Sequence, residues 1–285
     1  MDPELIADYR CVCGEGPLWH PIEKRLYWAD IATARMFRYD PATGRHEQFY
    51  EGEPLGGFTF QADGSLLLFG AGGSVRTWHD GVETTIIAEI PEERGMMFND
   101  VRADPRGRVF GGTVDPAGGS GRLYRLNLDG TYDRLLDGVR CSNGIGFTLD
   151  LRRMYYTDSM EYVIYLFDYD QATGALANQR VFVRTPSDGG MPDGMNVDAE
   201  GYVWSARWDG SCLVRHAPDG HEVKRITFPA KQVSSVVLGG EGYMDIYVTT
   251  AGGSDRAELG PGSGALFRIN LGICGLPEFL SRIRL

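Results

Sequence analysis

The sequence predicts an all-β fold, a six-bladed β-propeller in which each blade is a four-stranded antiparallel sheet. Glycine supplies 39 of the 285 residues, about twice its usual ~7% share, which indicates many tight turns. One supersecondary unit recurs along the chain, as in repeat architectures. Within each unit, aromatic and β-branched residues alternate with polar ones, as in strands with one buried face. No segment requires a long helix.

Each repeat contains a short apolar run, an Asp/Gly or Pro/Gly turn and a strongly alternating run. The alternating runs begin at Leu26, Leu66, Val109, Met154, Val203 and Ile246, so successive repeats are 40, 43, 45, 49 and 43 residues apart. This is the spacing of propeller blades. A third run follows in every repeat and a fourth in most, which predicts four strands per blade. A β-sandwich, the competing all-β fold, does not account for six matched repeats.

The turns and the two chain ends complete the expected architecture. The segments DPATG, Asp40 to Gly44, and DQATG, Asp170 to Gly174, are typical of hairpin turns. We expect residues 1–285 to form one propeller domain. Either the N-terminal segment ELIADYRCVC or the C-terminal segment LPEFLSRIRL supplies the outer strand of the last blade.

Charge and composition exclude several classes of partner. The chain has 28 Lys and Arg against 39 Asp and Glu, a net charge of −11, which disfavours binding to nucleic acids and anionic membranes. The N-terminus lacks the pattern of a signal peptide, and no apolar run approaches the ~18 residues of a membrane span. We therefore expect a soluble, cytoplasmic protein. Its five scattered cysteines are expected to be reduced thiols.

Register-equivalent positions of the repeats predict a site. In a propeller the first strand of each blade lines the central channel, so residues at matching positions converge at one mouth. Counting back 10 or 11 residues from each alternating run gives Glu15, Gly56, Asn99, Asn143, Asp193 and Ser235. Four of these carry a carboxylate or amide oxygen, the ligands that Ca²⁺, Mg²⁺ and Mn²⁺ prefer. A cation would also relieve the repulsion between the two carboxylates.

The chemistry of this set favours a catalytic metal over a closed structural one. Gly56 leaves one sector without a side chain, and Ser235 offers only a hydroxyl, so water and substrate could complete the coordination. The alternative is that Asn143 and Asp193, in CSNG and PDG, are turn or cap residues. The sequence contains no G-x-S-x-G, H-E-x-x-H or P-loop pattern.

With these motifs placed, the chain resembles the family of senescence marker protein (regucalcin), gluconolactonase and luciferin-regenerating enzyme. The matching segments are GEGPLWHPIEKRLYWADI, FNDVRADPRGRVFGGT, CSNGIGFTLDLRRMYYTDS and PDGMNVDAEGYVWSARWDG. The resemblance implies one divalent cation held by Glu15, Asn143 and Asp193. Ca²⁺ is the first expectation, with Zn²⁺, Mn²⁺, Mg²⁺ and Fe²⁺ as alternatives.

The resemblance also implies a substrate-binding stretch at Asn99, with Asp100 beside it. Where family members usually carry an arginine two residues before that asparagine, this chain has Met97. A thioether replaces a five-donor guanidinium, so polar recognition is lost there. Arg94, in the same loop, is a candidate replacement.

These expectations lead to metal-assisted hydrolysis of a lactone, such as the sugar lactone of gluconic acid. Asp193 would act as the catalytic general base or as a ligand to the attacking water, and Asn99 would orient the substrate. Two other functions stay open: hydrolysis of phosphotriesters or aryl esters at the same metal, and calcium binding without catalysis. The sequence indicates neither the particular sugar nor the oligomeric state.

Overall fold

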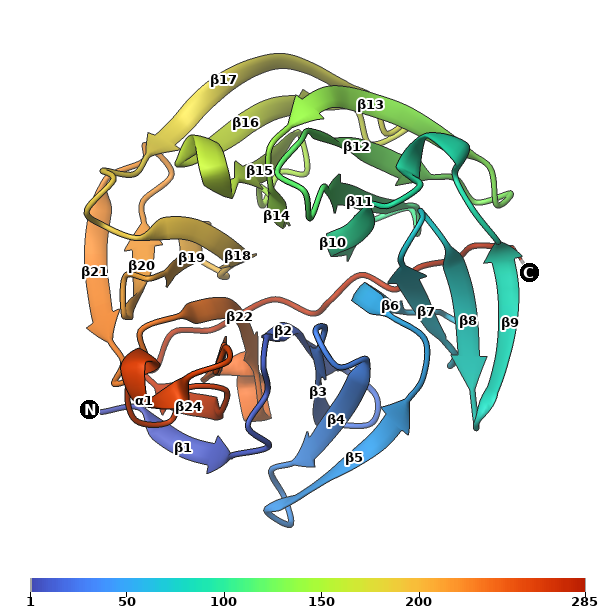
Figure 1. Cartoon of the computed structure of the whole chain (residues 1–285). Coiled ribbons are helices and arrows are strands. Elements are labelled where there is room, and N and C mark those ends of the chain that lie inside the picture. The colour runs from blue at the N-terminus through green and yellow to red at the C-terminus, as the bar shows by residue number, and fades with distance from the viewer. Residues whose placement is uncertain (1, 285) are drawn as a thin grey trace. The chain divides into compact units, whose positions relative to one another are not determined.

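The computed structural model describes residues 2–284 and contains six four-stranded antiparallel sheets (Figure 1). This confirms the predicted fold class, a six-bladed β-propeller with almost no helix. The described residues include one short α-helix, α1 (Arg256–Leu259), and three 3₁₀ turns at Pro91–Glu93, Ser159–Glu161 and Glu241–Tyr243. None of the described helices is long and apolar enough to cross a membrane.

The chain divides into two compact units, and each is described here by itself. The first unit contains the chain up to Gly52 and Phe182–Glu278. Its first two blades are β2 (Gly14–His20), β3 (Arg25–Asp30), β4 (Arg35–Asp40), β5 (Arg45–Glu51) and β18 (Met191–Val197), β19 (Val203–Trp208), β20 (Cys212–His216), β21 (Glu222–Thr227). Its third blade joins β22 (Val233–Gly239), β23 (Asp245–Thr250) and β24 (Leu266–Asn270) to β1 (Glu4–Ala7).

Strand β1 decides which end of the chain completes the last blade. It pairs antiparallel with β24, with Glu4 opposite Arg268. The side chains of this pair also form an ion pair of 2.7 Å. The N-terminal segment is therefore the one that supplies the outer strand.

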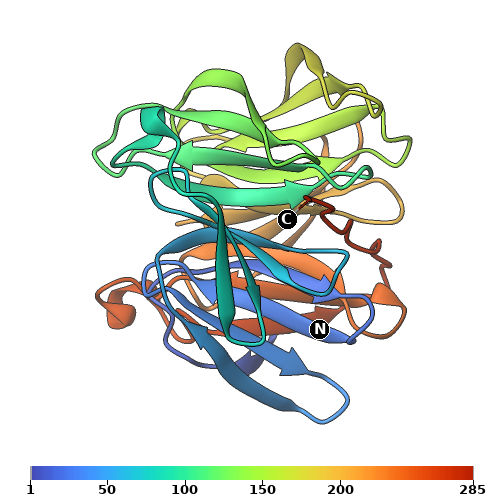
Figure 2. The ribbon, with the colours of Figure 1, turned by 90° about the vertical axis from the view of Figure 1, so that its right-hand side faces the viewer.

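The second unit contains Glu53–Val181 and the chain from Phe279 onward. Its blades, with strands lying side by side in Figure 2, are β6 (Leu55–Phe60), β7 (Leu66–Gly70), β8 (Val75–His79), β9 (Val82–Ile87); β10 (Met97–Ala103), β11 (Val109–Val114), β12 (Gly121–Leu126), β13 (Tyr132–Val139); and β14 (Ser142–Phe147), β15 (Arg153–Asp158), β16 (Val163–Tyr169), β17 (Leu176–Arg184).

The C-terminal segment packs on the second unit without forming a strand. Ser281 N donates to Phe60 O at 2.8 Å, and Arg282 N donates to Gly107 O at 2.8 Å. Gln61 exchanges two hydrogen bonds with the backbone of Ile283, at 2.7 and 3.0 Å. The segment therefore connects the blade of β6 to the blade of β10.

Within each unit, the alternating runs bury their apolar faces between neighbouring blades. Trp19 and Trp28 of the first blade pack with Tyr247 of β23, and the rings of Trp19 and Tyr247 stack with centroids 6.1 Å apart. A Cβ atom on Gly239 would lie 2.7 Å from the Trp19 ring, so a glycine is needed for this close contact. Burial of such large rings is the main stabilising term of the sheets.

Cysteines and turns match the expectations from sequence. All five cysteines are free, and Cys11 is buried in the core of the first unit. The carbonyl of Asp40 accepts a hydrogen bond from Gly44 N at 2.9 Å, and that of Asp170 accepts one from Gly174 N at 2.7 Å. Both segments are the predicted hairpin turns.

Candidate functional site

The six register-equivalent residues all lie in the first strand of their blades. Each of these strands has an irregular pairing step at that point, and the steps fall at Glu15/Leu18, Leu55/Gly57, Phe98/Val101, Ser142/Ile145, Pro192/Met195 and Val233/Ser235. A bulge breaks the in–out alternation of a strand and redirects side chains at functional sites. The shared irregularity explains how a polar residue fits into a strand that is otherwise apolar.

In the first unit, the site residues are Glu15 of β2 and Asp193 of β18. Both side chains are buried, each residue being 3% exposed. Burial raises the pKa of Cys13 well above its usual range, and the charges of Glu15 and Asp193 raise it further. The charges of both carboxylates therefore reach the same thiol, that of Cys13. A buried pair of like charges is costly unless a cation or a proton compensates it.

Close strand packing in the first unit fixes the position of Asp193. The next residue, Gly194, approaches β22 so tightly that a Cβ atom would lie 2.0 Å from Ser235 Oγ. Only glycine fits there, which gives the PDG motif a packing function in addition to its carboxylate. On β2, Glu15 Oε2 accepts a hydrogen bond of 3.1 Å from Gly16 N.

In the second unit, the amide nitrogens of Asn99 and Asn143 each donate a hydrogen bond to another residue. Asn99 Nδ2 donates to Ser142 O at 2.7 Å, which ties β10 to β14. Asn143 Nδ2 donates to Ser159 Oγ at 3.1 Å. Asn143 Oδ1 is buried and has no hydrogen-bond partner among residues 2–284. An unsatisfied buried acceptor costs about 1–3 kcal/mol, and a cation would satisfy it.

Asp100 lies beside Asn99 in the bulge of β10. Burial raises its pKa to about 6, and the nearby charge of Arg102 opposes this shift. Asp100 keeps part of its surface exposed, so it is surrounded by protein but still open to small molecules. A carboxylate of this kind can accept hydrogen bonds from a hydroxylated ligand.

Each unit contains oxygen donors of the kind that hard divalent cations prefer. In the first unit, Glu15 and Asp193 offer carboxylate oxygens. In the second unit, Asn143 offers a buried amide oxygen without a hydrogen-bond partner among residues 2–284. Among residues 2–284, no group of three or more His, Cys, Asp or Glu side chains could hold a metal. Carboxylate and amide oxygens favour calcium or magnesium over the metals that cysteine and histidine bind.

Comparison with known proteins connects this geometry to a family. The model of the SMP-30/Gluconolactonase/LRE-like region matches residues 13–252. The chain belongs to this family. Pentonolactonase XacC of Haloferax volcanii is 45% identical over the full length of both chains. Regucalcin of Gallus gallus is 32% identical over 97% of each.

Solved structures of the family show the same fold. A calcium-binding protein, regucalcin, from Agrobacterium tumefaciens has a TM-score of 0.92 and 25% identity, over 99% of this chain and 98% of that one. A luciferin-regenerating enzyme has a TM-score of 0.91 and 24% identity, over 99% of this chain and all of the other. The resemblance seen in the sequence motifs is therefore confirmed.

The departure from the family pattern at Met97 is not offset by a free arginine at position 94. Arg94 forms two hydrogen bonds with Glu89, of 2.9 and 2.6 Å, and its side chain is 71% exposed. Met97 opens β10, opposite Val114. The loop before Met97 contains a buried glutamate, Glu93, which the residue pattern does not reveal.

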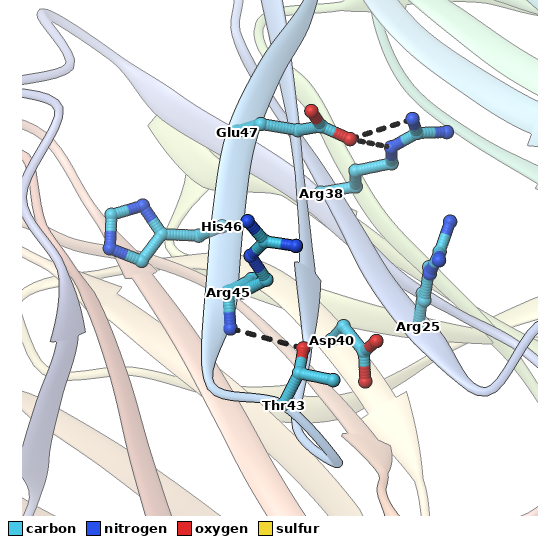
Figure 3. A pocket seen from close by; sticks show the side chains of 7 residues that line it. All are labelled: Arg25, Arg38, Asp40, Thr43, Arg45, His46 and Glu47. Carbon is cyan, nitrogen blue, oxygen red and sulfur yellow. Dashed lines mark hydrogen bonds and ion pairs between the residues drawn. The ribbon is translucent and has the colours of Figure 1, made fainter.

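A surface hollow in the first unit contains none of the predicted site residues. Its volume is about 510 Å³, and Figure 3 shows Arg25, Arg38 and Arg45 around it with Asp40 and Glu47. Arg38 pairs with Glu47 at 2.6 Å. Acidic and basic groups interleave on this surface, which is typical of a solvated blade edge.

Proposed function

We propose that this family member hydrolyses a sugar (aldonic-acid) lactone with the help of one divalent cation, Ca²⁺ being the first candidate. The full-length identity of 45% with a pentonolactonase carries the proposal. Five-carbon aldonolactones are therefore the first substrates to test, with gluconolactone beside them. The proposed cation ligands are Glu15, Asn143 and Asp193, and the unsatisfied oxygen of Asn143 supports this choice.

In the proposed mechanism, Glu15, Asn143 and Asp193 would hold the divalent cation, which would supply Lewis-acid polarisation of the lactone carbonyl. Asp193 accepts a proton from the attacking water as the water oxygen bonds to the carbonyl carbon. The ring C–O bond then breaks, and the departing alkoxide oxygen takes up that proton. The product is the open-chain acid, which ionises to the aldonate at neutral pH.

The stretch Met97–Asp100 orients the sugar in this proposal. Asn99 donates through its nitrogen to Ser142 O, so its Oδ1 is the atom that accepts a substrate hydroxyl. Asp100 accepts a second hydroxyl. Met97 presents an apolar surface without donors, which suits a substrate with fewer hydroxyls to satisfy at that point.

Metal analysis and a lactone panel, with and without chelator, test this function. We expect one bound divalent ion per chain and turnover of aldonolactones that is lost with EDTA and restored by Ca²⁺. Glu15→Gln and Asn143→Ala should weaken metal binding by about tenfold or more, and Asp193→Asn should lower kcat by about 100-fold or more.

Asp40→Asn is the matched control, because Asp40 is an acidic turn residue of the same unit outside the proposed site. Turnover of paraoxon-like esters but not lactones would instead support an ester hydrolase with the apolar Met97 in its site. Metal binding without turnover on any panel member would support a calcium-binding protein. Wild-type turnover by Asp193→Ala would refute the assignment of the base.

A further inference from the structure

The loop from Ile90 to Met96 delivers the chain to β10, where the substrate-binding stretch begins. Both ends of the loop are fixed by Gly72: Ile90 N donates to Gly72 O, and Gly72 N donates to Met96 O, each at 2.9 Å. Between them, Pro91–Glu93 forms a 3₁₀ turn. Met96 N closes the loop by donating to Glu93 O at 2.9 Å. The position of Met97 therefore depends on how this loop is seated.

Glu93 points away from solvent although Glu92 and Arg94 on either side of it are exposed. It is 0% exposed, and its Oε1 accepts two hydrogen bonds from β12, which lies in the blade that begins with β10. Tyr124 OH donates at 2.6 Å and Arg122 Nη1 donates at 2.8 Å. We name the three side chains, Glu93, Arg122 and Tyr124, the loop clamp.

Arg122 extends the loop clamp toward the substrate-binding stretch. Its Nη1 also donates to Glu92 O at 3.1 Å and lies 3.7 Å from Met96 Sδ. One guanidinium thus holds three successive parts of the loop, the last of them directly before Met97. Neighbouring Glu93 raises the pKa of Arg122, which keeps this cation charged at all working pH values.

Burying the Glu93 carboxylate in a surface loop costs folding free energy. Glu93 Oε2 is buried and has no hydrogen-bond partner among the described residues. A buried carboxylate with one unsatisfied oxygen is tolerated where the surrounding structure needs it, and such groups concentrate at functional sites. An exposed polar side chain would serve a simple connecting loop equally well.

We infer that the loop clamp is a positioning device for the substrate-binding stretch Met97–Asp100, and that Arg122 and Tyr124 determine lactone affinity through it. The inference rests on the proposed function for its substrate. It assigns the three side chains no contact with the lactone. These side chains hold the loop in one conformation, and the loop in turn fixes the position of β10. Asn99 and Asp100 are thereby held in the geometry that binds the sugar hydroxyls.

Limited proteolysis tests the loop clamp without a measurement of enzymatic activity. Arg94 is an exposed trypsin site in the middle of the loop, and cleavage there requires local opening. In Tyr124→Phe and Arg122→Met, we expect the Arg94–Gly95 bond to be cut about tenfold faster or more than in wild type, since hydrogen bonds to a charged group are lost. Arg180→Met is the matched control, because Arg180 lies in the same unit, on β17, and pairs with Asp168 instead of a residue of the loop clamp.

Steady-state kinetics of the same variants test the positioning. We expect KM for the preferred lactone to rise about fivefold or more while kcat changes by less than about twofold, because the variants disturb substrate binding and leave the metal ligands intact. Tyr124→Phe is the decisive variant, since it keeps the ring and removes one hydroxyl. Glu93→Gln keeps the shape and should show the same pattern.

The outcomes separate this inference from the proposed function. Cleavage at Arg94 as slow in both clamp variants as in wild type would overturn the inference, whatever the enzyme acts on. Faster cleavage with KM and kcat both unchanged would also overturn it. If wild type hydrolysed no lactone yet bound a lactone in calorimetry, a weaker Kd in Tyr124→Phe would support the inference while the proposed reaction failed.

Discussion

Trp204 donates its indole N–H to the buried carboxylate of Asp198 at 2.9 Å. The same Oδ2 atom accepts from Arg215 Nε at 2.8 Å, and Oδ1 accepts from the backbone N–H groups of Glu200 and Tyr202 at 3.0 Å. The Arg215 guanidinium also lies 3.9 Å from the centroid of the Tyr202 ring. Asp198 thus links the turn after β18 to β19 and β20.

Removing this carboxylate should therefore destabilise the first unit strongly. We expect Asp198→Ala to lower the free energy of unfolding by about 2–4 kcal/mol, because it leaves the Trp204 indole N–H and Arg215 Nε without their acceptor, while Arg215 Nη2 keeps its bond to Glu200. Urea denaturation measures the change. Asp219→Ala, in an exposed turn where the carboxylate accepts a hydrogen bond from His221 N, should cost less than about 1 kcal/mol. Equal effects of the two variants would contradict this prediction.

Asp100 should make the protein less stable as the pH rises. Its pKa in the folded state is about 6, above the ordinary value of 3.8, so the folded state holds this proton more tightly than the unfolded state. The stability contributed by the neutral form is full below about pH 4 and is lost between pH 4 and 6. With allowance for the partial exposure of Asp100, we expect Asp100→Asn to raise the free energy of unfolding by about 1–2 kcal/mol above pH 6.

The comparison of Asp100→Asn with wild type is made in EDTA, so that no cation compensates the charge. Thermal unfolding at pH 4 and at pH 7.5 gives the two values. A variant with the same advantage at both pH values would show that the carboxylate charge is not the cause.

His216 should make the protein less stable as the pH falls, in contrast to Asp100. Its Nε2 lies 2.7 Å from Arg207 Nη2, and its Nδ1 lies 3.0 Å from Gly220 O. Burial, with the charge of Arg207 as the second cause, lowers the pKa of His216 from 6.5 to about 4. The folded state therefore resists protonation, and the stability present above pH 6.5 is lost as the pH falls toward 4.

We expect wild type to lose roughly 2–3 kcal/mol of stability from His216 over this range. In His216→Gln, which keeps an acceptor for Arg207, this part of the pH dependence should disappear. Denaturant titrations at pH 4, 5.5 and 7 test it, with His221→Gln, at an exposed position, as the control. A slope that His216→Gln leaves unchanged would assign the effect to another group.

Deleting residues 279–285 should weaken the second unit. The deletion removes the backbone hydrogen bonds to Phe60, Gly107 and Leu128, and it leaves the buried amide of Gln61 without its two partners. Each unsatisfied amide group costs about 1–3 kcal/mol, so we expect a lower Tm. Gln61→Ala separates the side-chain contribution and should reproduce part of the loss. A deletion variant with the wild-type Tm would show that the segment is dispensable.

Much of the architecture was predictable because strand alternation is local. The repeat placed Glu15, Asn143 and Asp193 in the first strands of their blades, as observed. The bulges were not predictable, since a side chain shifted by one pairing step leaves no mark in the residue pattern. The buried state of Glu93 was hidden as well, because PEERG has the composition of a solvated turn and only the contact with β12 shows otherwise.

The pairing of β1 with β24 joins Glu4 to Arg268, so this blade combines two segments that lie 264 residues apart in the chain. Closing a chain segment of this length costs about 5 kcal/mol of entropy. A nascent chain cannot finish this sheet until translation has passed β24. A product that stops before then leaves β1 without its pairing partner, so premature termination exposes an unpaired strand edge that can associate with other chains.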